Sequence, residues 1–302
     1  MSVVVKNLVK QYGEQKAVND VSFQVDTGEI VGFLGPNGAG KSTTMKIATG
    51  YLPPTSGSIL VAGYNVNSHP LEVRERVGYL PEHNPLYLDM YVLEYLHFIA
   101  GLHKLSNKTA KERTADMIAL TGLEKEKKKK IGALSKGYRQ RVGLAQSLIH
   151  DPSVLILDEP TTGLDPNQIV EIRNVIKAVS KEKTVILSTH IMQEVQALCS
   201  RAIIINTGEI VADKPISQLR ANFDNSLTIK VEFAEKINPD IFNTLQFSKV
   251  ENIEKNIYHF HTSTSKDPRV EIFNIAAKQQ TPIVAMSLEV VSLENVFQNL
   301  TQ

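Results

Sequence analysis

The sequence lacks three features that mark large classes of protein. It has a single cysteine, Cys199, which excludes an internal disulfide and favours a reducing compartment. It has no apolar run near the length of about 18 residues that a membrane-spanning helix needs. The opening residues, Met1 to Lys6, lack the basic start and apolar core of a signal peptide. We therefore expect a chain that does not itself cross a membrane.

The chain also lacks an excess of either charge. Its 33 basic and 32 acidic residues give a formal net charge of +1, so no global field favours DNA, RNA or an anionic membrane surface. We expect no nucleic-acid partner. The 302 residues, of which 42% are hydrophobic, give room for one large domain or two domains of ordinary size.

A glycine-rich segment is the strongest motif that is present. It fits the pattern G-x-x-x-x-G-K-[ST] and comprises Gly35, Pro36, Asn37, Gly38, Ala39, Gly40, Lys41, Ser42 and Thr43. A strand-like run precedes it and a helical pattern follows it, as a phosphate-binding loop requires. Lys41 would reach the β- and γ-phosphates of a nucleotide, and Ser42 would bind Mg²⁺. The alternative is a glycine-rich turn before an ordinary helix.

Polar side chains end three further strand-like runs. Asp158 and Glu159 follow one apolar run, and Glu82 and His190 each follow another. Ligands of open parallel sheets collect at such strand ends. Two carboxylates after a buried strand need a cation, so one acid would hold Mg²⁺ while its neighbour orients or deprotonates the attacking water. A lone histidine is usually structural, but His190 follows a strand that should run parallel to the Asp158 strand.

Two residues outside these strands are weaker candidates for nucleotide contacts. Tyr12 stands beside a turn ahead of the phosphate loop, where an aromatic ring either stacks on adenine or simply packs. Ser135 is placed to cap a helix that begins at Lys136, and the start of that helix is a second candidate anion site.

The pattern of predicted elements indicates how the rest of the first domain is built. Strand-like runs within residues 3–25, separated by turn residues at Tyr12–Gly13 and Asn19–Asp20, predict a small antiparallel sheet. Helical spacing of apolar residues over 86–123 predicts an inserted helical subdomain.

The pattern changes between Ser217 and Asp224, and we place a domain boundary after residue 221. The predicted order beyond it is strand 227–233, helix 239–245, strand 247–253, strand 257–262, helix 269–278, strand 282–288 and a closing helix 292–300. This is the split βαβ, or ferredoxin-like, order. Neither charge nor motif marks residues 222–302 as catalytic or RNA-binding.

Together the motifs resemble the ATP-binding subunit of an ABC transporter over roughly Val3 to Leu219. The resemblance implies an α/β fold: an ABC-type P-loop ATPase domain over 1–221, with a mixed sheet core, an antiparallel β subdomain and a helical subdomain. The small α+β ferredoxin-like domain over 222–302 would follow it.

The resemblance also implies an activity and a set of site residues. The chain would be a Mg²⁺-dependent ATPase, with Glu159 as catalytic base, His190 sensing the γ-phosphate and Tyr12 stacking on adenine. Mg²⁺ would be held by Ser42, Asp158 and Glu82, and the signature residues Ser135 and Gly137 and the loop residue Asp165 would contact the nucleotide of a partner subunit. Two chains would close on two ATP molecules and drive a separate membrane permease from the cytoplasmic face of the membrane.

Two departures from the family pattern stand near the nucleotide. Glu82 occupies the position where the family usually has glutamine, and Lys136 and Tyr138 replace glycine and glutamine in the signature, while Ser135 and Gly137 remain. A carboxylate near a triphosphate needs compensation, either by the metal or by a nearby base.

A narrower resemblance concerns the transporter group. Residues 79–82 and 292–297 resemble ATPases of ABC-2 type exporters, and residues 81–87 are similar to the gliding-motility-associated ATP-binding subunit. Two alternatives belong to other classes: a soluble ABC ATPase acting on DNA, ribosomes or assembly factors, and an ATP-gated scaffold that does not hydrolyse. ATPases of the first kind usually carry two ATPase domains in tandem or a long coiled-coil insert, and neither is seen in this sequence. The presence of Glu159, the expected catalytic base, argues against the second.

Overall fold

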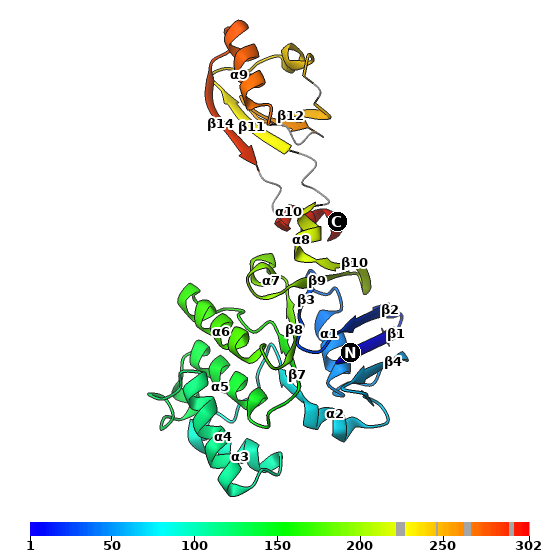
Figure 1. The fold of residues 1–302 in the computed structure, drawn as a ribbon, viewed down its shortest axis with the longest axis vertical. Helices are drawn as coiled ribbons and strands as arrows, with labels where there is room; N and C mark the ends of the chain where they lie inside the picture. The colour runs from blue at the N-terminus through cyan, green and yellow to red at the C-terminus, as the bar shows by residue number, and fades with distance from the viewer. Residues whose placement is uncertain (222–226, 246, 263–266, 290–292, 302) are drawn as a thin grey trace. The chain divides into compact units, whose positions relative to one another are not determined.

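The chain folds into two units. The computed structural model describes residues 1–221, 227–245, 247–262, 267–289 and 293–301. The first unit is Met1–Lys214 with Thr301, and the second is Pro215–Leu300 (Figure 1). Residues 222–226, which follow the domain boundary predicted from the sequence, lie outside the described residues, and that boundary stays a prediction.

A six-stranded sheet is the centre of the first unit. Its strand order is β10-β9-β3-β8-β7-β6, and the pairings of β3 with β9 and β8, and of β7 with β8 and β6, are parallel. The strands are β3 (Ile30–Leu34), β6 (Val77–Leu80), β7 (Val154–Asp158), β8 (Thr184–Thr189), β9 (Arg201–Asn206) and β10 (Glu209–Pro215). Every residue of β7 and β8 is buried, which explains their continuous apolar runs. The carboxyl ends of β3, β6, β7 and β8 therefore meet at one edge.

A second sheet in this unit is antiparallel, as predicted. Its order is β2-β1-β4-β5, formed by β1 (Val3–Tyr12), β2 (Gln15–Val25), β4 (Ser56–Val61) and β5 (Tyr64–Asn65). The predicted turn at Asn19–Asp20 is wrong. Both residues lie inside β2, where Asp20 takes a φ of 54° beside a shift in strand register, so the strand absorbs the turn-forming residues as an irregularity.

The predicted helical insertion is a pair of helices packed on a third (Figure 1). Helices α3 (Val92–Leu102) and α4 (Asn107–Leu120) contact each other and α5 (Lys136–Leu148), and their apolar faces share one buried core. The other helices of the unit are α1 (Lys41–Ala48), α2 (Pro70–Arg76), the 3₁₀ helix η1 (Ile131–Ala133), α6 (Pro166–Val179) and α7 (Met192–Leu198). No helix in the described parts of the chain is long and apolar enough to cross a membrane.

The second unit contains an antiparallel sheet with the order β12-β13-β11-β14. Its elements are α8 (Ile216–Ala221), β11 (Leu227–Phe233), η2 (Pro239–Phe242), β12 (Lys249–Glu254), β13 (Ile257–Thr262), α9 (Arg269–Lys278), β14 (Ile283–Glu289) and α10 (Leu293–Thr301). This is the predicted ferredoxin-like order. The helix predicted over 239–245 is wrong in type, because a single 3₁₀ turn forms there and its Phe242 fills the core. Ser292, the predicted start of the last helix, lies outside the described residues.

Candidate active site

The glycine-rich loop links β3 to α1 and owes its shape to Gly40. This residue is the N-cap of α1 with a φ of 105°, a conformation that residues with a side chain rarely adopt. A Cβ on Gly40 would collide with the Ala17 carbonyl oxygen of β2. Only glycine therefore lets the loop pass so close to β2 and then enter the helix.

Lys41 lies folded back onto this loop. Its ammonium donates hydrogen bonds to the carbonyl oxygens of Gly35 at 2.8 Å and Pro36 at 3.1 Å, and it lies 3.7 Å from a carboxylate oxygen of Glu159. Burial lowers the pKa of Lys41, while the charge of Glu159 opposes that shift. The loop carbonyls thus hold a dehydrated cation at the mouth of the loop, where a phosphate would be its stronger partner.

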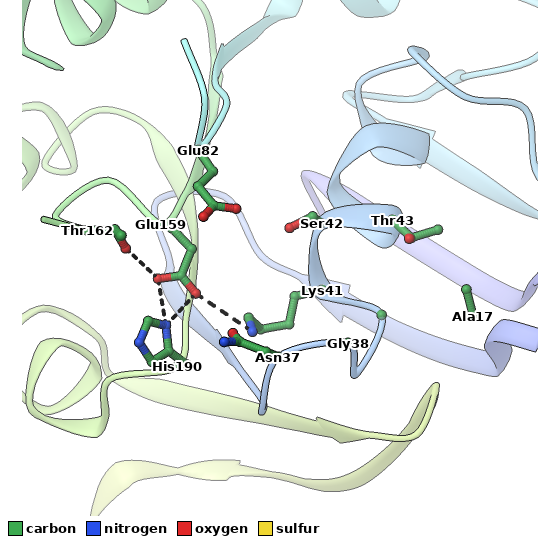
Figure 2. Close-up of a pocket in the computed structure, with 11 residues that line it drawn as sticks. Ala17, Asn37, Gly38, Lys41, Ser42, Thr43, Glu82, Glu159, Thr162 and His190 are labelled. Atoms are coloured by element: carbon green, nitrogen blue, oxygen red, sulfur yellow. Dashed lines mark hydrogen bonds and ion pairs between the residues drawn. The ribbon is translucent and has the colours of Figure 1, made fainter. Parts of the chain in front are cut away.

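Glu159 stands directly after β7 and is almost fully buried. Its backbone has a φ of 51°, which is strained for a residue with a side chain and is typical of functional turns. Its Oε1 lies 2.9 Å from Nδ1 of His190, and its Oε2 accepts a hydrogen bond of 3.0 Å from the Thr162 hydroxyl (Figure 2). The contact with His190 uses Nδ1, so Nε2 is the nitrogen with which the imidazole can meet a ligand.

The side chains of Ser42, at the start of α1, and Asp158, at the end of β7, form a hydrogen-bonded pair. The Ser42 hydroxyl donates to Oδ1 of Asp158 at 3.1 Å. Burial raises the pKa of Asp158, and this hydrogen bond opposes the shift. A carboxylate desolvated in this way is a fitting ligand for a hard cation such as Mg²⁺. The described residues contain no cluster of three or more His, Cys, Asp or Glu side chains suited to a metal.

With the exception of Asp158, which is buried behind Ser42, these side chains line one pocket of about 400 Å³. Figure 2 shows the loop and α1 on one side of it, and Glu82, Glu159, Thr162 and His190 on the other. The lining residues are Ala17, Asn37, Gly38, Gly40, Lys41, Ser42, Thr43, Glu82, Glu159, Thr162 and His190. The structure therefore brings together most of the loop and all three of the predicted catalytic residues.

Glu82 enters the pocket from the turn after β6. Its side chain is 41% exposed, and its negative charge weakly opposes the lowering of the Lys41 pKa by burial and adds weakly to the rise of the Asp158 pKa that burial causes. The remaining loop residues lie behind the lining: Gly35 and Pro36 supply carbonyls to Lys41, and Ala39 is buried.

Four predicted nucleotide contacts lie outside this pocket. Tyr12 is 48% exposed at the end of β1, with the Lys10 ammonium 5.2 Å from its ring centre. Ser135 caps α5, and Asp165 caps α6 by accepting a hydrogen bond of 2.9 Å from the Gln168 backbone N–H. Gly137 is buried against the Gln168 side chain, in space that a Cβ would fill. One chain alone does not bring these residues to the phosphate loop.

Two lining residues escaped the sequence reasoning. Thr162 lies three residues after Glu159, and a hydroxyl so close to the predicted base could have indicated a hydrogen bond to it. Ala17 carried no signal, because it reaches the pocket through β2 of the antiparallel sheet, a contact that only the fold reveals.

Comparison with known proteins identifies the family. Residues 18–162 match the ABC transporter family. The uncharacterized ABC transporter ATP-binding protein YhcH of Bacillus subtilis (strain 168) is 30% identical over 298 residues, which are 98% of this chain and 94% of YhcH. The chain belongs to the ABC transporter family. The Nod factor export ATP-binding protein I of Burkholderia orbicola (strain AU 1054) is also similar, with 38% identity over 209 residues and 69% of each chain covered.

A solved structure extends this ABC transporter relationship to the fold. The ATP-binding cassette MJ0796, solved as a dimer in a post-hydrolysis state bound to ADP and Pi, shares 25% identity with a TM-score of 0.66. The match covers 71% of this chain and 98% of MJ0796. The present chain is accordingly an ABC ATP-binding subunit with the ATPase fold of its family, and it is an ATP-hydrolysing enzyme.

Proposed function

We propose that this ATPase binds and hydrolyses Mg²⁺-ATP in the pocket of Figure 2. The observation that supports this most is the meeting of three groups at one cavity of about 400 Å³: the Lys41 ammonium, the Ser42 hydroxyl bonded to the buried Asp158 behind the lining, and the Glu159 carboxylate beside His190. A phosphate-binding cation, a metal site and a base are the parts that phosphoryl transfer to water requires.

Each residue of the site has a role in ATP hydrolysis that follows from its chemistry. Lys41 would exchange its two loop carbonyls for the β- and γ-phosphates. Ser42 and Asp158 would hold Mg²⁺, which supplies charge neutralisation of the phosphates, and Glu82 would approach the same ion from the opposite wall. Glu159 would take the proton of the attacking water, while His190 presents Nε2 to the γ-phosphate.

We further propose that two copies complete two sites. Ser135, Gly137 and Asp165 lie outside the pocket of their own chain, as groups that serve a partner's nucleotide must. The dimer of MJ0796 with ADP and Pi supports this arrangement by similarity. In it, Tyr12 would stack on adenine beyond the phosphate loop.

The partner that we propose is a separate integral-membrane permease at the cytoplasmic face of the membrane. A relative that carries an export name and the full-length similarity to YhcH support a transport subunit, with residues 1–221 as the ATPase domain and residues 222–302 as an accessory domain. The relatives named above carry no link to gliding motility, so we propose export without that association. They also give no support to a soluble ATPase acting on DNA or ribosomes.

Capture of the assembled complex tests the permease partnership. A tagged Glu159→Gln chain, loaded with Mg²⁺-ATP, is incubated with detergent-solubilised membranes of the producing cell. Lys41→Ala, treated in the same way, is the matched control because it lacks the charge that holds the phosphates. We expect one multi-spanning membrane protein to be enriched with Glu159→Gln and not with the control. Enrichment of ribosomal protein or nucleic acid instead would overturn the transport assignment.

A further inference from the structure

A buried carboxylate lies just outside the pocket. Glu194, in the first turn of α7, is 1% exposed. Its two oxygens accept hydrogen bonds from two threonine hydroxyls: Oε1 from Thr161 and Oε2 from Thr189, the latter at 2.9 Å. Burial raises the pKa of Glu194. An apolar side chain would fill this place at lower cost, so the carboxylate calls for a reason beyond packing.

The two threonines belong to the segments that carry the reactive groups. Thr161 follows Glu159 by one intervening residue, in the loop after β7, and Thr189 directly precedes His190, at the end of β8. Each is almost fully buried. The backbone N–H of Ile191 also donates to the Thr189 hydroxyl at 3.1 Å, which anchors the turn into α7 on the same side chain. One carboxylate thus joins the two loops from which Glu159 and His190 reach into the pocket.

The contact between Glu159 and His190 depends on the relative position of the two loops that carry them. The Glu159 carboxylate touches Nδ1 of His190 at 2.9 Å and 3.0 Å, so a shift of either loop breaks that contact. Displacement of a reactive group by about 1 Å can cost about 100-fold in rate. β7 and β8 pair up to Asp158 and Ser188, and the backbone N–H of Glu159 still donates to the Ser188 carbonyl oxygen at 2.9 Å. Beyond this bond, the hydrogen bonds of Glu194 to Thr161 and Thr189 add a side-chain link between the two loops.

We propose that Glu194 is a positioning residue for ATP hydrolysis: by accepting hydrogen bonds from Thr161 and Thr189, it fixes the separation of Glu159 and His190. The inference rests on the roles proposed above for those two residues. Glu194 does not line the pocket and acts through its neighbours.

Threonine-to-valine variants remove each donor with little change of shape. Thr161→Val and Thr189→Val should each lower the kcat for ATP by about 10-fold to 100-fold, with the KM for ATP within about twofold of wild type. The matched control is Thr184→Val. Thr184 is a buried residue at the opposite end of β8, and its hydroxyl accepts from Gly28 at 3.1 Å and donates to the Asp26 carbonyl at 3.3 Å. It should lose thermal stability to a similar degree and keep kcat within about twofold.

Variants at Glu194 separate positioning from packing. Glu194→Gln offers one oxygen as acceptor and an amide as donor to the two hydroxyls, so kcat should stay within about threefold of wild type. Glu194→Leu fills the space without hydrogen bonds and should lose about as much kcat as Thr161→Val combined with Thr189→Val. If the threonine variants match Thr184→Val in kcat, or if Glu194→Leu is as active as Glu194→Gln, the proposal is wrong. Glu159→Gln, assayed in parallel, tests the underlying site: if it hydrolyses ATP normally, the fault lies in the site assignment and not in Glu194.

Discussion

Replacing Gly40 by alanine tests how the phosphate loop is built. Gly40 holds a φ of 105°, and a Cβ there would meet the backbone oxygen of Ala17, which has no freedom to move aside. Gly38, two residues earlier in the same loop, has a φ of 81° but open space around its missing Cβ. The two alanine variants therefore differ in one respect, the collision with β2.

The expected cost can be estimated from these two features. A residue with a side chain in a left-handed conformation costs about 1–2 kcal/mol, which both variants incur. The overlap with Ala17 adds about 1–3 kcal/mol in Gly40→Ala alone, because either the loop or β2 must shift. At about 2–4 °C per kcal/mol for a unit of this size, Gly38→Ala should lower the Tm by about 2–8 °C and Gly40→Ala by about 4–20 °C.

Thermal melts without nucleotide measure this difference, so that contacts to a ligand play no part. Calorimetric titration with ATP then tests the loop. We expect Gly40→Ala to bind ATP at least about tenfold more weakly than Gly63→Ala, a variant with a positive φ of 84° and open space in the turn between β4 and β5, outside the pocket. Equal Tm values for Gly40→Ala and Gly38→Ala would refute the close approach of the loop to β2.

Three further predictions concern titratable side chains. Lys41→Ala should weaken ATP binding by at least about tenfold in calorimetry, since a charge-assisted contact to phosphate is lost, and unchanged affinity would remove Lys41 from the site. Glu82→Gln should still bind ATP and retain some hydrolysis while the Mg²⁺ concentration for half-maximal rate rises, whereas curves superimposable on wild type would leave Glu82 without a role. Burial lowers the pKa of His150 from 6.5 to about 4. Between these two pH values, His150 therefore binds a proton in the unfolded chain but not in the folded chain. Stability should therefore fall as pH drops from about 6.5 to about 4, and His150→Gln should flatten this loss in melts across that range; an equal slope in both proteins would contradict the assignment.

Much of the site could be predicted from local sequence, because its residues lie at the ends of strands that the apolar pattern marks. Apolar runs of β7 and β8 that stop at a polar residue place Glu159 and His190 at the same edge as the loop after β3. The cap by Ser135 could also be predicted, because a helix cap depends only on the residues of its own turn.

What escaped prediction depended on contacts between distant segments. Asn19 and Asp20 are turn formers by composition, yet the pairing of β1 with β2 keeps them in a strand. The link of Glu194 to Thr161 and Thr189 joins three separate parts of the sequence, and no local pattern announces it.

The central claim is that the pocket at Lys41 hydrolyses ATP with Glu159 as base, between two copies of the chain. The most direct measurement follows ATP turnover and molecular mass of Glu159→Gln in Mg²⁺-ATP, beside wild type and Lys41→Ala. The amide keeps the shape of Glu159 but cannot accept the proton of water, so turnover should fall by about 100-fold to 10,000-fold while a dimer accumulates. Lys41→Ala should remain monomeric. A Glu159→Gln chain that stays monomeric, or that hydrolyses ATP at the wild-type rate, would contradict the account.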